Sequence, residues 1–249
     1  MKGLLSLCIV IQIFNTDVFC QKKQIDSLII DFKGFLFDYK IQPARRALEI
    51  YEQAAIPKII PLLYSNKFTP ITNNPYLMYP ASKEYMYTHG YIIPYHLDWI
   101  SIRAGWLMEE LTFMDFGFKT ALDEKKYAVI NDYSHNGKKE VPWINVPTKA
   151  SLLKSRKPMA DAVASWWQKN KATWTRIGAL KDALQSNNTK RQLIALNYLI
   201  NGFRNEEEPL TSKYLNEIAP LVLVLKKSTH KNIAQYAERL EEIWLYKDQ

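Results

Sequence analysis

Apolar residues recur at helical spacing near the beginning of the chain, over residues 25–63. The segment QPARRALEIYEQA places Pro43 at a helix start, where a missing amide hydrogen is tolerated, and sets Ala47, Ile50 and Tyr51 on one side. The segment AIPKIIPLL then predicts a short second helix. We therefore expect a helix, a proline-bearing turn and another helix in this region.

The most strongly apolar helix is expected over residues 97–113. One face would carry Trp99, Ile102 and Trp106, and the adjacent face Ile100, Ala104, Leu107, Met108 and Leu111. An apolar stripe this wide indicates a helix buried between neighbours. Arg103, Glu109 and Glu110 fall on the narrower polar side, which predicts a solvated or salt-bridged edge for these three side chains.

Regular helical patterns return at Pro158 and continue to the end of the chain. They are KPMADAVASWWQKNKATW, TRIGALKDALQSNN, TKRQLIALNYLINGF, TSKYLNEIAPLVLVLKKS and THKNIAQYAERLEEIWLY. Pro158 would begin the first of these helices, and Thr211 and Thr229 would be the N-caps of the last two. At least one of Trp166 and Trp167 should lie in the core. Helices of this length joined by short turns are what stacked antiparallel helix pairs require.

Two segments break the helical pattern, residues 64–96 and 119–157. The first holds seven of the 15 tyrosines and would form a long insertion, with a short hairpin within YMYTHGYIIPY. Tyr87, Tyr91 and Tyr95 are candidates for contacting a partner, because tyrosine combines a large contact area with a polar tip. The alternative is that these tyrosines pin an irregular loop onto the helices beneath it.

Three stretches carry a family resemblance: RRALEIYEQAAIPKIIPLL, RAGWLMEELTFMDFGF, and ASWWQKNK with the helical segments that follow it. They resemble segments of bacterial HEAT-like α-helical repeat proteins. The resemblance implies an all-α fold, an irregular α-solenoid of antiparallel helix pairs, in one domain over residues 21–249 that contains the two insertions. It also implies a tight, aromatic-anchored turn at Phe116 and Gly117, although Phe113 stands where the class usually has glycine. The residues expected to form the structural motif are Trp99, Arg103, Trp106, Glu110, Phe116, Gly117, Trp166 and Trp167.

The first 20 residues have the pattern of a cleavable signal peptide. Lys2 precedes an apolar run over residues 3–14, which is shorter than the roughly 20 residues that a membrane-spanning helix needs. Cleavage after Cys20 would remove both cysteines, Cys8 and Cys20, and would leave a mature chain without disulfides or thiol chemistry. This predicts export to the periplasm or cell envelope of a bacterium. Two alternatives stay open, a lipidated Cys20 that attaches the protein to a membrane and a buried N-terminal helix.

The formal net charge is +8, and residues 119–191 hold the excess, with 15 Lys and Arg against 6 Asp and Glu. A basic surface attracts phosphates, acidic lipids or acidic polysaccharides. Lys138, Lys139, Arg156 and Lys157 are the candidates for contacting an anionic partner. The alternative is a set of solvated helix faces and loops. The sequence has no RNA- or DNA-binding motif, so no nucleic-acid partner is expected.

The sequence contains no established catalytic or metal-binding motif. With 8 glycines, it has neither a G-x-S-x-G elbow nor a phosphate-cradling loop. His89, His96 and Asp98 lack the spacing of common metal ligands, so no metal or cofactor is expected. Glu109 and Glu110 are adjacent and would point about 100° apart on a helix, which does not aim both carboxylates at one bond.

These observations favour a non-enzymatic, exported helical-repeat protein that serves as a binding or scaffold module for a protein or an anionic envelope component. An envelope carbohydrate hydrolase is the first alternative, with its site between the tyrosine-rich segment and Asp98 or Asp115. It predicts two carboxylates that face each other across a cleft. The second alternative is an immunity or inhibitor protein that neutralises a secreted enzyme.

Overall fold

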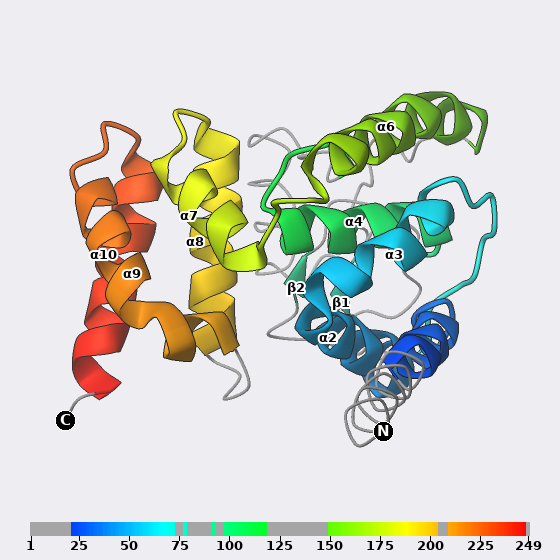
Figure 1. Ribbon diagram of the computed structural model, residues 1–249, viewed down its shortest axis with the longest axis horizontal. Helices are drawn as coiled ribbons and strands as arrows, with labels where there is room; N and C mark the ends of the chain where they lie inside the picture. The colour runs from blue at the N-terminus through cyan, green and yellow to red at the C-terminus, as the bar shows by residue number, and fades with distance from the viewer. Residues whose placement is uncertain are drawn as a thin grey trace, which may run out of the picture.

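The fold is helical in the part of the chain that the structure describes, apart from two strands of two residues each (Figure 1). The computed structural model describes residues 21–72, 77–78, 91–92, 97–118, 149–203 and 209–247. A first helix over residues 21–32 and a π-helical turn, η1 (Phe37–Ile41), precede α2 (Gln42–Ile50), the 3₁₀ turn η2 (Glu52–Ala54), α3 (Ile56–Leu63), β1 (Leu77–Met78), β2 (Tyr91–Ile92), α4 (Ile100–Thr112), α6 (Lys149–Asn170), α7 (Arg176–Gln185), α8 (Thr189–Phe203), α9 (Pro209–Leu225) and α10 (Lys231–Lys247). This confirms the all-α fold.

Helix α4 is the centre of the N-terminal half. Every residue of α4 except Glu110 is buried. The helix packs against α3 and α7, and α6 packs on α3 as an outer layer (Figure 1). The wide apolar stripe in the sequence therefore correctly predicts a helix that neighbours enclose.

Helices α7–α10 form a bundle beside the N-terminal half (Figure 1). Helix α7 packs against α8 and α9, and α10 packs against α8 and α9. Contacts between alternate helices, α7 with α9 and α8 with α10, are also the contacts that two stacked antiparallel pairs would make. A solenoid that extends over the whole chain stays a prediction.

The chain turns sharply after α4. Phe113 ends the helix in the left-handed conformation, with φ of 53°. Gly117 has φ of 88°, and Phe116 packs edge to face against Trp166 with ring centroids 5.8 Å apart. Of Phe116, Gly117 and Phe118, the last has its side chain in the core, because it is 1% exposed. Phe116 and Gly117 thus do form the anchored turn expected from the sequence.

Two local expectations are wrong. Helix α6 begins at Lys149, so Pro158 lies inside the helix and residues 149–157 do not belong to an irregular segment. The hairpin expected within YMYTHGYIIPY lies outside the described residues except for β2, which pairs in parallel with β1. Helix α10 begins at Lys231, and Thr229 lies before its N-cap position. In both helices the sequence pattern located the element but not the residue at which it begins.

The prediction that Thr211 is an N-cap is also wrong. Thr211 lies inside α9, which begins at Pro209, so it does not cap the helix. Proline and threonine are frequent at helix starts, but both residues also occur inside helices. Neither residue by itself therefore fixes where a helix begins. Pro61 and Pro220 likewise lie inside helices, α3 and α9.

Candidate functional site

Arg103 is fully buried, so the expectation that it lies on a solvated edge of its helix is wrong. Its guanidinium donates to the carbonyl oxygen of Phe32, the last residue of the first helix, at 2.8 Å and to that of Gly34, just beyond the helix, at 2.9 Å. It also donates to the carbonyls of Thr69 at 3.3 Å and Leu97 at 3.1 Å. A buried guanidinium is stable only when its N–H groups have acceptors. Arg103 is therefore a structural clamp that joins three separate segments of backbone.

Glu109 is also fully buried and not on a solvated edge. Its Oε1 accepts hydrogen bonds from the backbone N–H groups of Phe116 at 3.0 Å and Phe118 at 2.9 Å. These two donors belong to the turn that follows α4, whose backbone has no helical partners of its own. The carboxylate thus holds the aromatic turn in place.

Four charged side chains meet where α2, α4 and α7 come together, and we name them the junction cluster: Arg45, Glu49, Glu110 and Arg176. Glu49 accepts from Arg45 Nη1 at 3.2 Å and from Arg176 Nη2 at 2.9 Å. Arg45 Nη1 also donates to Glu110. Arg176 is 1% exposed, and its Cζ lies 4.7 Å from the centroid of the Tyr198 ring. The cluster therefore balances two carboxylates with two guanidinium groups.

The junction cluster brings two carboxylates together, as the hydrolase alternative requires. Glu49 and Glu110 contact the same nitrogen of Arg45. The guanidinium of Arg45 lies between them, where a glycosidic bond would have to lie in a hydrolase. The same region joins the two halves of the protein, since Lys190 on α8 pairs with Asp115 after α4 at 3.1 Å. The geometry fits a connection between helices better than an acid–base pair.

Arg156 is 3% exposed and does not belong to an exposed basic surface, which corrects the sequence prediction for this residue. Its Nη1 donates to Ser101 Oγ and, at 3.5 Å, to the Ser65 carbonyl. Its Cζ lies 4.9 Å from the Trp99 ring centroid. Burial lowers the pKa of the Arg156 guanidinium from its ordinary value. Arg156 is buried because it belongs to α6, not to an irregular segment, and lies on the side of this helix that faces α4.

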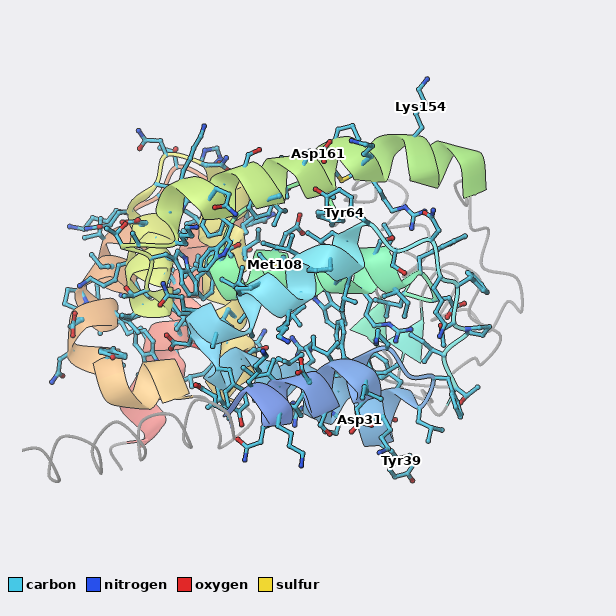
Figure 2. All side chains as sticks on the ribbon, turned by 45° about the vertical axis from the view of Figure 1, so that its right-hand side comes forward. Asp31, Tyr39, Tyr64, Met108, Lys154 and Asp161 are labelled. Atoms are coloured by element: carbon cyan, nitrogen blue, oxygen red, sulfur yellow. The ribbon has the colours of Figure 1, made fainter. Side chains whose placement is uncertain are left out.

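Lys157, the remaining described candidate, lies on the exposed side of α6. We name this side the α6 outer face, which consists of Lys154, Lys157, Asp161 and Lys169. Lys157 Nζ lies 2.8 Å from Asp161 Oδ2, and the Tyr64 hydroxyl donates to Asp161 Oδ1 at 2.9 Å. Figure 2 shows Tyr64 beside Asp161 and Lys154 extending away from the helix. Hydrogen bonds from Lys157 and then Tyr64 lower the pKa of Asp161. Asp161 therefore stays ionised between its two donors.

Tyr64 comes from the end of α3 and is 43% exposed. Burial, and secondarily the hydrogen bond to Asp161, raises the pKa of its hydroxyl. Sequence reasoning missed the pairing of Tyr64 with Asp161, because the two residues are 97 positions apart and neither belongs to a motif. Only the packing of α6 over α3 brings them together.

The tryptophan pair divides as the sequence suggested. Trp167 is 5% exposed and packs against Trp174 with ring centroids 5.9 Å apart. Trp166 is half-buried and contacts Phe116. Trp99 and Trp106 are both buried on α4 or at its N-cap, and each ring lies beside a guanidinium, of Arg156 and Arg45 respectively. All four indoles therefore serve packing.

Several predicted residues cannot be placed in the structure. Tyr87, Tyr95, Lys138, Lys139, His89 and His96 lie outside the described residues, and of Tyr91 only the backbone, in β2, is described. Asp98 is buried and accepts a hydrogen bond from the Ile71 amide at 2.9 Å. Within the described ranges, no group of three His, Cys, Asp or Glu side chains is placed to hold a metal ion.

No family model, curated protein or solved structure matches this chain. Among the helices that the structure describes, none is long and apolar enough to cross a membrane. The function must therefore be inferred from the residues of the two sites described above.

Proposed function

We propose that the protein is a non-enzymatic, exported helical binding module that holds an anionic envelope component on the α6 outer face. The observation that carries the proposal is how charged groups divide between the interior and the surface. Buried Arg103 and Glu109 are bonded to backbone groups of the fold. Lys154, Lys157 and Lys169, in contrast, are exposed along one helix.

The local charge supports an anionic partner. The exposed charged residues between positions 154 and 171 are Lys154, Lys157, Lys169, Lys171 and Asp161, which gives a net charge of +3. Such a concentration of one sign raises the local concentration of oppositely charged ligands. Because the lysines are exposed, salt screens their attraction over a Debye length of about 8 Å at physiological ionic strength. Binding through this face should therefore weaken steeply as salt is added.

Export is the second part of the proposal. It is supported by Lys2, by the apolar run over residues 3–14 and by the restriction of cysteine to positions 8 and 20. An exported protein would meet the acidic polymers of the cell envelope rather than nucleic acids. The proposal therefore joins the location that the sequence favours to the charge of the α6 outer face.

The test compares two variants of the purified protein that each remove four positive charges. The first is K154Q/K157Q/K169Q/K171Q, on and directly after α6, and the control is K181Q/K190Q/K227Q/K231Q, on the C-terminal bundle. Binding to immobilised oligogalacturonate and to polyphosphate would be measured at increasing salt. We expect the first variant to lose about tenfold or more in affinity and the control much less. An equal loss in both variants would overturn the proposal, as would wild-type binding that does not respond to salt.

A carbohydrate hydrolase is the second candidate, because Glu49 and Glu110 contact the same nitrogen of Arg45. It predicts that the protein cleaves a polysaccharide and that E49Q and E110Q each abolish cleavage. The free energy of unfolding would be measured on the same samples. Loss of cleavage without loss of stability would favour the hydrolase over the binding module.

A further inference from the structure

The α6 outer face has one negative charge between positive charges. At 1.5 Å and about 100° per residue, Lys169 lies about 22 Å along the helix from Lys154 and about 60° around it. Asp161 lies between them, about 10 Å from Lys154 along the axis and about 20° around it. Along this face the carboxylate therefore stands between lysines, with Lys154 and Lys157 before it and Lys169 after it.

The central position is a hydrogen-bonding group rather than a cation. The Asp161 side chain is 49% exposed, and each of its oxygens accepts one hydrogen bond, from Lys157 or from Tyr64. A carboxylate oxygen has room for a further donor. Tyr64 adds an exposed aromatic ring beside the carboxylate (Figure 2). Together they offer an acceptor for hydroxyl groups and an aromatic surface for an apolar ring face.

This pattern discriminates between anionic ligands. A polymer with a negative charge on every unit and no donor, such as polyphosphate, is repelled by Asp161 at the centre of the face. A polymer whose anionic groups are accompanied by hydroxyl groups can pair with the lysines and donate to Asp161 at the same time. A sugar ring can also lie against Tyr64.

We propose that the α6 outer face binds a linear acidic polysaccharide, with anionic groups of the chain at Lys154 and Lys169 and with sugar hydroxyls at Asp161 and Tyr64. This inference rests on the proposed function, because it uses the same face, and it adds the chemical class of the ligand. The two lysines can be reached together only by a chain that spans about 22 Å. A mono- or disaccharide therefore binds much more weakly than a longer oligomer.

The decisive variant is D161N, tested against oligogalacturonate and against polyphosphate of similar charge. It removes the negative charge and frees Lys157 from its ion pair, so any purely charge-driven ligand binds more tightly, by about twofold to fivefold. Oligogalacturonate instead binds about fivefold more weakly, because the charged acceptor for its hydroxyls is lost. The matched control is D182N, which removes an equally exposed carboxylate from α7.

The outcomes separate this inference from the proposed function. If D161N strengthens the binding of both ligands, or changes the affinity for each ligand no more than D182N does, the polysaccharide assignment is wrong. The ligand class is then a polyanion without the hydroxyl contacts. If K154Q/K169Q leaves the binding of both ligands unchanged, the proposed function itself fails. Y64F should keep most of the affinity for oligogalacturonate and Y64A should lose it, since the ring is present only in the former. Equal affinities of Y64F and Y64A would also contradict the assignment.

Discussion

Glu109 offers the sharpest test of the structural interpretation, because one of its oxygens accepts two backbone hydrogen bonds. Glu109→Ala removes the acceptor of the Phe116 and Phe118 amides. A buried donor left without a partner costs about 1–3 kcal/mol, so two of them cost about 2–6 kcal/mol. Glu109→Gln keeps a carbonyl oxygen of the same shape in the same place. It loses only the extra strength of a charged acceptor, about 1–2 kcal/mol.

The free energies of unfolding would be measured by urea denaturation, followed by tryptophan fluorescence and circular dichroism. The fluorescence includes that of Trp166, against which Phe116 of the turn packs. The expected order of stability is wild type, Glu109→Gln and then Glu109→Ala. Glu217→Gln is the matched control, since Glu217 is half-exposed and its ion pair with Lys181 should contribute less than about 1 kcal/mol.

Two results would refute this reasoning. If Glu109→Ala is as stable as the Glu217→Gln control, the carboxylate does not anchor the turn. If Glu109→Gln loses an activity of the protein while its stability is unchanged, Glu109 has a chemical role that the hydrogen bonds to the turn do not explain.

Three further predictions test the core, the junction cluster and the α6 outer face. Gly105→Ala should lower the free energy of unfolding by about 1–3 kcal/mol, because a Cβ there would clash with the ring of Phe118; an unchanged denaturation midpoint would contradict this packing. A double-mutant cycle of Glu49→Gln and Arg176→Gln should give a coupling energy of about 1–3 kcal/mol, and a value near zero would show that the junction pair does not stabilise the fold. Asp161→Asn should lower the pKa of Tyr64, since it removes a negative charge that raises this pKa and weakens the hydrogen bond from the hydroxyl. Ultraviolet titration against the same variant with Tyr64→Phe would isolate this hydroxyl, and an unmoved midpoint would disprove the contact.

The sequence predicted helices well wherever the local pattern decides the structure. Pro43 stands in the first turn of α2, and the apolar stripe over residues 97–113 corresponds to α4. Gly117 takes the left-handed conformation that a tight turn requires. These features depend on residues only a few positions apart, which a periodic pattern can report.

The polar side of α4 could not be predicted in the same way. Arg103 reaches carbonyl groups of Phe32 and Gly34, about seventy positions earlier in the chain. Glu109 binds amides of a turn whose conformation the sequence does not fix. A hydropathy pattern treats a charged residue as exposed, and it cannot recognise a charged residue whose buried partners lie far away in the sequence. Burial of these two residues is therefore a property of the tertiary structure.

The position of Arg156 decides how variants of the basic region must be interpreted. Arg156→Gln removes a buried guanidinium from Trp99 and from Ser101, so it should lower the free energy of unfolding by about 1–3 kcal/mol and loosen α6 from α4. Lys157→Gln changes an exposed side chain and should leave stability within about 1 kcal/mol of wild type. If both variants weaken polyanion binding, denaturation of the same samples separates the causes, because only the effect of Arg156 should follow stability. Equal stability of the two variants would mean that Arg156 does not hold α6 against the fold, and that the α6 outer face is positioned by other contacts.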